Sequence, residues 1–129
     1  MTGFKWSLRS KKEMYNIHPD LRRVCNLALK MSDIDFLIID GRRTIAEQRM
    51  HVKNGASKTL RSRHLHGYAV DVAPLIEGKI RWEPAYFKPL GVVFKKAAIR
   101  ARVPIVWGGD WKWKDWGHFE LDKKVYPDP

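Results

Sequence analysis

Two short runs of alternating side chains constrain the fold of this chain more than any other feature of its sequence. In residues 69–73, alternation places Asp71 and two alanines on one face of a strand and two valines on the other. In residues 118–121, the same period places His118 and Glu120 on one face, while a phenylalanine and a leucine face away. Each strand is therefore expected to bury one apolar face and to present polar, chemically active side chains on the other.

The polar residues of these strands, with one residue upstream, have the composition of a metal site. His64 precedes Asp71, and Gly67 between them predicts a turn, which places His64 on a loop and Asp71 on the strand that follows. The spacing differs from that of a HExxH helix, whose two histidines stand four residues apart. A catalytic zinc ion takes three His, Asp or Glu ligands and keeps a fourth position open. His64, Asp71 and His118 can supply the three ligands.

A wider pattern surrounds these residues and covers most of the chain. It consists of Ser62-x-His64-x-x-Gly67-x-Ala69-x-Asp71, Asp115-x-x-His118, Gly41-Arg42-Arg43-Thr44 and Gly109-Asp110-Trp111. This pattern resembles the signature of zinc peptidases that include VanY-type D-Ala-D-Ala carboxypeptidases and phage L-alanyl-D-glutamate endopeptidases, the latter acting as endolysins. In size and order of motifs the chain is most similar to the single-domain phage enzymes.

The resemblance implies a role for each site residue. His64, Asp71 and His118 would bind Zn²⁺, Asp115 would be the general base, and Arg43 would face the substrate. His66 falls on a variable position of the pattern, so it is left outside the ligand set, and a role on the substrate side stays open for it. Further candidates for substrate binding or for orienting the ligands are Ser62, Gln48, Asp110 and Glu120.

The remaining patterns predict the scaffold around the site. Apolar residues at helical spacing predict a helix over 19–31, and the apolar run 36–39 predicts a buried strand. Thr44 and Glu47 form a capping box, which predicts a helix from there to about Asn54 that ends at Gly55. Arg43 then lies at a strand-to-helix junction, where a planar guanidinium can be held to bind a carboxylate or an oxyanion.

The second half of the chain is expected to add a hairpin, a long helix and a further strand. The residues around Glu77-Gly78 predict a hairpin turn, and 84–102 predict a helix that Pro89 and Gly91 interrupt or delay. Residues 104–107 read as a strand. With the resemblance, these elements indicate an α+β fold in which a small, mainly antiparallel sheet carries the zinc site and packs against helices. We expect one peptidase domain over 1–129, without a separate cell-wall-binding domain.

Composition and charge indicate which partners and which cellular location to expect for this chain. The formal net charge is +11, which favours attraction to polyanions such as peptidoglycan stem peptides and the anionic cell envelope. Alternating Trp and Lys in 111–116 could stack nucleic-acid bases or wall a substrate cleft; we favour the cleft and expect no specific nucleic-acid partner. The start of the chain lacks the apolar core of a signal peptide. Cys25 is expected in the core.

The predicted function is zinc-dependent hydrolysis of the L-alanyl-D-glutamate bond of peptidoglycan by a phage endolysin, for host lysis. The protein would be a monomer made in the host cytoplasm and released to the periplasm and cell wall with the help of a holin. The first alternative is a D-alanyl-D-alanine carboxypeptidase. A second is a non-catalytic zinc-containing binding protein, as the hedgehog domains illustrate, and a muramidase with paired carboxylates is a third.

Overall fold

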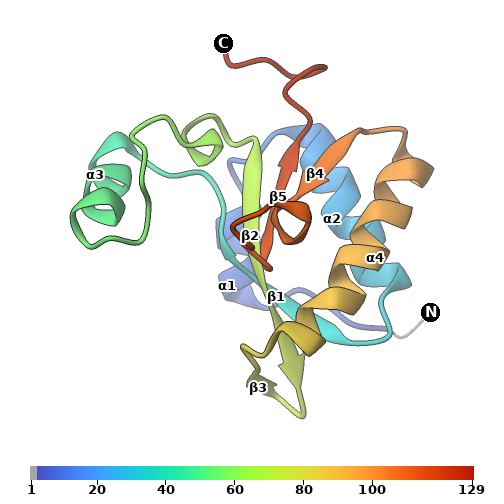
Figure 1. Cartoon of the computed structure of the whole chain (residues 1–129). Helices are drawn as coiled ribbons and strands as arrows, with labels where there is room; N and C mark the ends of the chain where they lie inside the picture. Colours follow the sequence, from blue (N-terminus) through green and yellow to red (C-terminus); the bar gives the residue numbers. More distant parts are fainter. Residues whose placement is uncertain (1–2) are drawn as a thin grey trace.

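A computed structural model describes residues 3–129 and shows a single antiparallel sheet packed against helices (Figure 1). The strand order is β1-β2-β5-β4, and β3 pairs with the far part of β2 as a hairpin. The elements, in chain order, are α1 Leu8–Met14, α2 Pro19–Met31, β1 Asp35–Asp40, α3 Ile45–Lys53, the 3-10 turn η1 Arg63–His66, β2 Ala69–Ile76, β3 Lys79–Ile80, α4 Pro84–Ala101, β4 Ile105–Trp107, the 3-10 turn η2 Gly108–Asp110 and β5 His118–Leu121.

The hydrophobic core lies between the sheet and the helices α1, α2 and α4 (Figure 1). Val70 and Val72 of β2 and Phe119 and Leu121 of β5 all face this core and are almost fully buried. The alternation read from the sequence therefore leaves Asp71, His118 and Glu120 on the opposite face of the same strands. The predicted α+β class with its antiparallel sheet is confirmed, and so is the burial of Cys25.

Several predicted element boundaries are confirmed to the residue or nearly so. Helix α2 covers the predicted 19–31 and has Pro19 in its first turn. Helix α3 begins after Thr44, whose side chain accepts a hydrogen bond from the Glu47 amide while the Glu47 carboxylate accepts one from the Thr44 amide. The predicted hairpin turn is present as well, with positive φ at both Glu77 and Gly78.

Two features of the helices differ from the sequence expectations. The predicted break in the long helix is wrong, because α4 runs without interruption through Pro89 and Gly91. Pro89 lies early in the helix and removes one backbone hydrogen bond there, while Gly91 leaves room for the indole of Trp107. Helix α1 was not predicted; its signal is Ser7, whose hydroxyl accepts a hydrogen bond from the Ser10 amide as an N-cap.

Helix α1 matters to the site although it contributes no ligand. The hydroxyl of Ser10 accepts a hydrogen bond from the Ile38 amide of β1, and the carboxylate of Glu13 accepts one from the Gly41 amide. A side chain at Gly41 would collide with the backbone carbonyl of Glu13. Glycine is therefore required where the chain leaves β1. Within 3–129, no helix combines the length and the apolar character needed to cross a membrane.

Candidate metal centre

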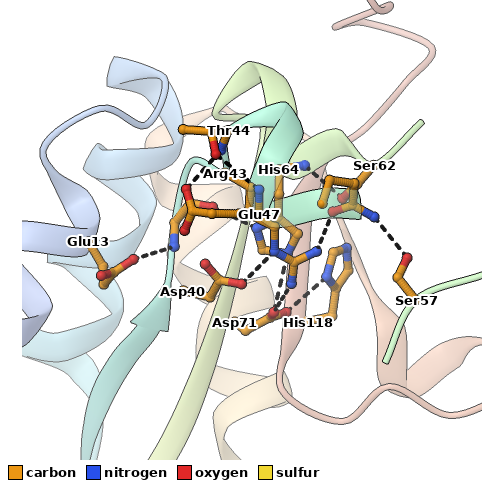
Figure 2. Close-up of polar contacts among 12 residues, drawn as sticks. Glu13, Asp40, Arg43, Thr44, Glu47, Ser57, Ser62, His64, Asp71 and His118 are labelled. Atoms are coloured by element: carbon orange, nitrogen blue, oxygen red, sulfur yellow. Dashed lines mark hydrogen bonds and ion pairs between the residues drawn. The ribbon is translucent and has the colours of Figure 1, made fainter. Parts of the chain in front are cut away.

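The three predicted ligands meet at one point of the sheet surface (Figure 2). Asp71 of β2 and His118 of β5 are direct partners in the antiparallel ladder, and His64 approaches from η1. One ligand atom from each of the three side chains lies within 4.8 Å of the other two. Residues distant in the chain thus form a group with the size and the donor types of a zinc site.

His64 is held with one ring nitrogen against the Gly41 carbonyl and the other facing Asp71. The side chain is 2% exposed, and its Nδ1 lies 2.7 Å from the Gly41 carbonyl, to which only a protonated nitrogen can donate. Its Nε2 then carries the lone pair, and it lies 3.2 Å from Oδ2 of Asp71. Within residues 3–129, this buried Nε2 has no hydrogen bond of normal geometry. A metal ion is the kind of partner that would satisfy it.

The turn that carries His64 is shaped by the residues on either side of it. Ser62 caps η1, and its hydroxyl accepts a hydrogen bond from the His64 amide at 3.2 Å. Gly67 ends the turn with φ of 73°, in the left-handed region that glycine enters without strain. A side chain there would also meet the backbone of Asn16. The predicted Ser62 is therefore placed as a support for the ligand loop.

His118 has a carboxylate at each ring nitrogen. Its Nδ1 lies 3.0 Å from Oδ1 of Asp71, and its Nε2 lies 2.8 Å from Oε1 of Glu120. Burial by itself would lower the pKa of His118, but the hydrogen bonds to Asp71 and Glu120 raise it to about 9. Glu120 is thus placed at the nitrogen that points away from Asp71 and His64, as expected for a residue that orients a metal ligand.

Asp71 is the common partner of the cluster. Burial would raise its pKa, but the interactions with His118 and then His64 outweigh burial and keep the pKa far below its usual value. Arg43 adds a cationic neighbour, with Nη2 at 3.2 Å from Oδ2 of Asp71. Asp71 is therefore ionised at neutral pH, in the form that binds a divalent cation.

Arg43 makes three separate contacts with its guanidinium (Figure 2). It donates from Nε to Asp40 at 2.6 Å, from Nη1 to Gln48 at 2.9 Å and from Nη2 to Asp71. The side chain is only 10% exposed. In this arrangement Arg43 holds Asp71 in place, and a contact with substrate stays a prediction.

Gln48 continues this network into the loop after α3. It is fully buried, and its Nε2 donates to the hydroxyl of Ser57 at 2.9 Å and to the carbonyl of Thr59 at 2.6 Å. Its Oε1 is the acceptor for Arg43. Gln48 thus links the guanidinium that holds Asp71 to the basic loop 56–61.

Asp115 lies in the turn that leads into β5. Its amide donates to the Gly108 carbonyl at 3.0 Å, and its carbonyl accepts from the His118 amide at 3.2 Å. Gly108 permits this close approach, because a side chain there would collide with Asp115. Burial, followed by the charge of Asp71, raises the pKa of Asp115 against the opposing effect of His118, His64 and Arg43. A carboxyl group with a raised pKa beside the ligand cluster suits a general base.

Not every predicted site residue is brought to the cluster. Asp110 is half exposed, and its Oδ2 forms an ion pair with Nζ of Lys95 on α4 at 2.6 Å. Among residues 3–129 it forms no hydrogen bond or ion pair with His64 or His118, so its predicted role in orienting them has no support from the geometry. His66 lies outside the ligand group and lines a cavity of about 540 Å³ together with Arg42, Arg43 and Leu65.

The tryptophan-rich segment does lie beside the ligands. The ring centroids of Trp111 and His118 are 5.1 Å apart, and Trp113 is 77% exposed. Across from it, Nζ of Lys58 lies 5.4 Å from the Trp113 ring centroid. The segment 111–116 and the loop 56–61 therefore approach each other near the metal centre, which agrees with the interpretation of this segment as a cleft wall.

Three supporting groups were missed in the sequence: the carboxylate of Asp40, the carbonyl of Gly41 and the side chain of Arg63. The first two belong to the turn in which Gly41 and Arg43 were already noticed. Arg63 stands inside the first pattern, at a position where the resemblance specifies no residue. A backbone carbonyl leaves no signal in the side-chain pattern, so only the structure could reveal that of Gly41.

The fold and this cluster together define a class: a small α+β protein with a His, Asp, His group able to hold a metal ion, and an acid beside it. A family model for the phage L-alanyl-D-glutamate peptidases matches residues 2–129. The chain belongs to this family.

Individual relatives agree with the family model. The L-alanyl-D-glutamate peptidase of Escherichia phage T5 is 32% identical over 128 residues, which cover 96% of this chain and 93% of that protein. The enzyme of the same name from Listeria phage A118 is also 32% identical, over 98% of this chain but only 45% of its own length. The crystal structure of the Serratia marcescens L-Ala D-Glu endopeptidase ChiX matches with a TM-score of 0.90 and 41% identity, over 97% of this chain and 95% of that one.

Proposed function

We propose that this protein is a phage endolysin that hydrolyses the L-alanyl-D-glutamate bond of peptidoglycan with a zinc ion held by His64, Asp71 and His118. Family membership and the named activity of the relatives support the bond and the substrate. The observation that carries the zinc dependence is the convergence of the three ligand atoms within 4.8 Å of one another.

The residues present fit zinc in kind and in orientation. Two imidazoles and one carboxylate form a common set for catalytic zinc. The Gly41 carbonyl directs Nε2 of His64 inward, and Glu120 directs Nδ1 of His118 toward Asp71. Because the raised pKa makes His118 an imidazolium at neutral pH in the metal-free protein, zinc binding would have to displace one of its two ring protons.

In the proposed reaction, zinc supplies Lewis acidity toward the scissile carbonyl. Asp115 takes the proton from the attacking water and later passes it to the leaving amine of D-glutamate. Its raised pKa favours this exchange, because a carboxylate of ordinary pKa is a weaker base. Arg43 orients Asp71 through the hydrogen bond from Nη2, and we propose that it also faces the substrate.

The positive surface and the cleft would keep the enzyme on its substrate. We propose that a net charge of +11 draws the protein to the anionic cell envelope. The protein would act as a monomer, released from the host cytoplasm with the help of a holin. Lysis should then weaken as ionic strength rises, since salt screens this attraction.

A digestion experiment tests both the metal and the bond. Purified Gram-negative peptidoglycan is treated with the native protein, with protein stripped by a chelator, and with stripped protein given zinc, and the fragments are identified by mass. We expect new amino-terminal D-glutamate with the native and zinc-restored protein only. Release of free D-alanine would instead favour the carboxypeptidase, and full activity of stripped protein would refute the proposal.

Variants of single carboxylates separate catalysis from metal binding. Asp115→Asn should retain zinc and fold while losing activity by about 100-fold or more, the scale of a general base. Asp33→Asn removes an exposed carboxylate outside the ligand cluster and serves as the matched control. An Asp115→Asn enzyme with undiminished turnover would exclude Asp115 as the base.

A further inference from the structure

Arg63 is a buried cation that the proposed reaction does not use. Its side chain is 6% exposed, although it immediately precedes the ligand His64 in η1. Its Nη2 donates to the carbonyls of Leu121 at 2.9 Å and Tyr126 at 2.7 Å, and its Nη1 donates to Oδ1 of Asp128 at 2.6 Å. These bonds fix the guanidinium from the side of the C-terminal segment.

The remaining edge of the guanidinium faces the metal site. Its Nε lies 3.5 Å from Oε2 of Glu120, and no hydrogen bond from this Nε is found within residues 3–129. The other oxygen of the same carboxylate, Oε1, lies 2.8 Å from Nε2 of His118. Glu120 therefore stands between Arg63 and a predicted metal ligand, with one oxygen toward each.

Because the guanidinium of Arg63 is rigid, the bonds along one edge determine where the other edge lies. A guanidinium is planar and always charged. The three hydrogen-bonded N–H groups of Nη1 and Nη2 therefore also set the position of Nε–H. The partner at the second nitrogen of a ligating histidine fixes the ring orientation and tunes metal affinity. Arg63 is thus able to hold the carboxylate that orients His118.

We propose that Arg63 is a positioning residue for the metal centre, acting on His118 through Glu120 and joining the segment of His64 to the segment that carries His118. The inference rests on the proposed zinc site and deepens it. Arg63 reaches β5 at Leu121 and Glu120 and belongs to the same turn as His64. One side chain therefore ties together the two histidine-bearing segments, which the backbone ladder does not link directly.

The test measures zinc affinity apart from turnover. Metal-free Arg63→Met is titrated with zinc in competition with a chromogenic chelator, and its cobalt(II) form is examined by visible absorption. We expect zinc affinity to fall about 10- to 100-fold, the range for groups that orient metal ligands, with an altered cobalt spectrum. Arg63→Lys, which keeps the charge but lacks the fork, should lie between this variant and the wild type.

Arg23→Met is the matched control. Arg23 also bonds a carboxylate, that of Asp20, and a backbone carbonyl, that of Ala101, but it lies on α2 away from the ligands. Its loss should leave zinc affinity and the cobalt spectrum unchanged. A folded Arg63→Met protein with wild-type zinc affinity would overturn the inference; if that variant does not fold, wild-type affinity of Arg63→Lys with an unchanged cobalt spectrum would do so.

A double-mutant cycle tests the route through Glu120. If Arg63 acts through this carboxylate, adding Arg63→Met to Glu120→Gln should weaken zinc binding little beyond the larger single effect. Fully additive losses would contradict the coupling. A wild-type protein that binds no zinc would refute the proposed function instead, so the two failures are distinguishable.

Discussion

The two halves of the candidate metal centre are held by different forces. Asp71 and His118 stand opposite each other in the β2 and β5 ladder, with apolar neighbours in the core behind them. His64 and Arg43 belong to the excursion between β1 and β2, residues 41–68, in which α3 stands apart from the sheet (Figure 1). Only Gln48 of α3 is buried, so polar contacts rather than a core secure this half.

This difference indicates where the site is rigid and where it is adjustable. A ladder with a packed apolar face opens only when much of the domain unfolds, whereas an element with few buried apolar contacts opens locally at lower free energy. The excursion also carries the loop 56–61 that faces the tryptophan segment. Substrate entry would therefore be accommodated by the excursion more readily than by the sheet.

The largest effect is expected at Asp71, the residue that the two halves share. Asp71→Ala removes a predicted ligand and leaves Arg43 and His118 without their common anion. Zinc binding and peptidoglycan hydrolysis should be lost. Without metal, the free energy of unfolding should fall by about 3 kcal/mol, typical of breaking a buried ion pair. Denaturant unfolding of the metal-free protein measures this loss, and unchanged stability would show that the halves are not linked through Asp71.

Arg43 should matter next, because it ties the excursion to Asp40 of β1 and Asp71 of β2. Arg43→Lys keeps one charge but cannot reach Asp40, Gln48 and Asp71 together. Hydrolysis should fall about 10- to 100-fold, as for a lost partner of a ligand. Amide hydrogen exchange should accelerate in 45–61 and stay unchanged in β2 and β5. Equal acceleration in both regions would contradict the division into two halves.

Gln48 tests how far polar contacts within the excursion hold the loop 56–61 in place. Gln48→Leu leaves one Arg43 N–H without a partner and removes the shorter of the two hydrogen bonds to the Thr59 carbonyl, at a cost of about 1–3 kcal/mol. We expect faster proteolysis of the loop 56–61 and a smaller loss of hydrolysis than for Arg43→Lys. Limited proteolysis followed by mass spectrometry locates the cleavage, with Gln48→Glu as the variant that retains the acceptor for Arg43.

The smallest effect is expected at the capping box of α3. Thr44→Ala should cost about 1 kcal/mol of helix stability.

The hydrogen bond from the Thr44 amide lowers the pKa of Glu47 below 4.5. A carboxylate with a lowered folded pKa stabilises the protein above its unfolded pKa and loses that contribution as pH falls through the folded value. The difference in unfolding free energy between wild type and Glu47→Gln should therefore shrink as the pH drops below about 4.5. A difference that grows on acidification would contradict this sign.

Much of the fold could be predicted because local patterns already specify it. Alternation in 69–73 and 118–121 correctly separated the face toward the hydrophobic core from the face of the candidate site, since successive side chains of a strand point to opposite faces. The capping box located the start of α3 for an equally local reason. The break expected at Pro89 is absent because the buried apolar face of α4 and the packing of Gly91 on Trp107 offset the backbone hydrogen bond that an interior proline removes.

The sequence by itself determined that His64, Asp71 and His118 form the candidate centre, and on which face of their strands Asp71 and His118 lie. Only the tertiary structure decided how they are oriented. It placed the Gly41 carbonyl on His64, made Arg43 a brace for Asp71, paired Asp110 with Lys95 and enclosed Arg63 beside Glu120. The physical reason is range: alternation and capping act between neighbours in the chain, whereas these contacts join residues that meet only once the sheet and its excursion have folded together.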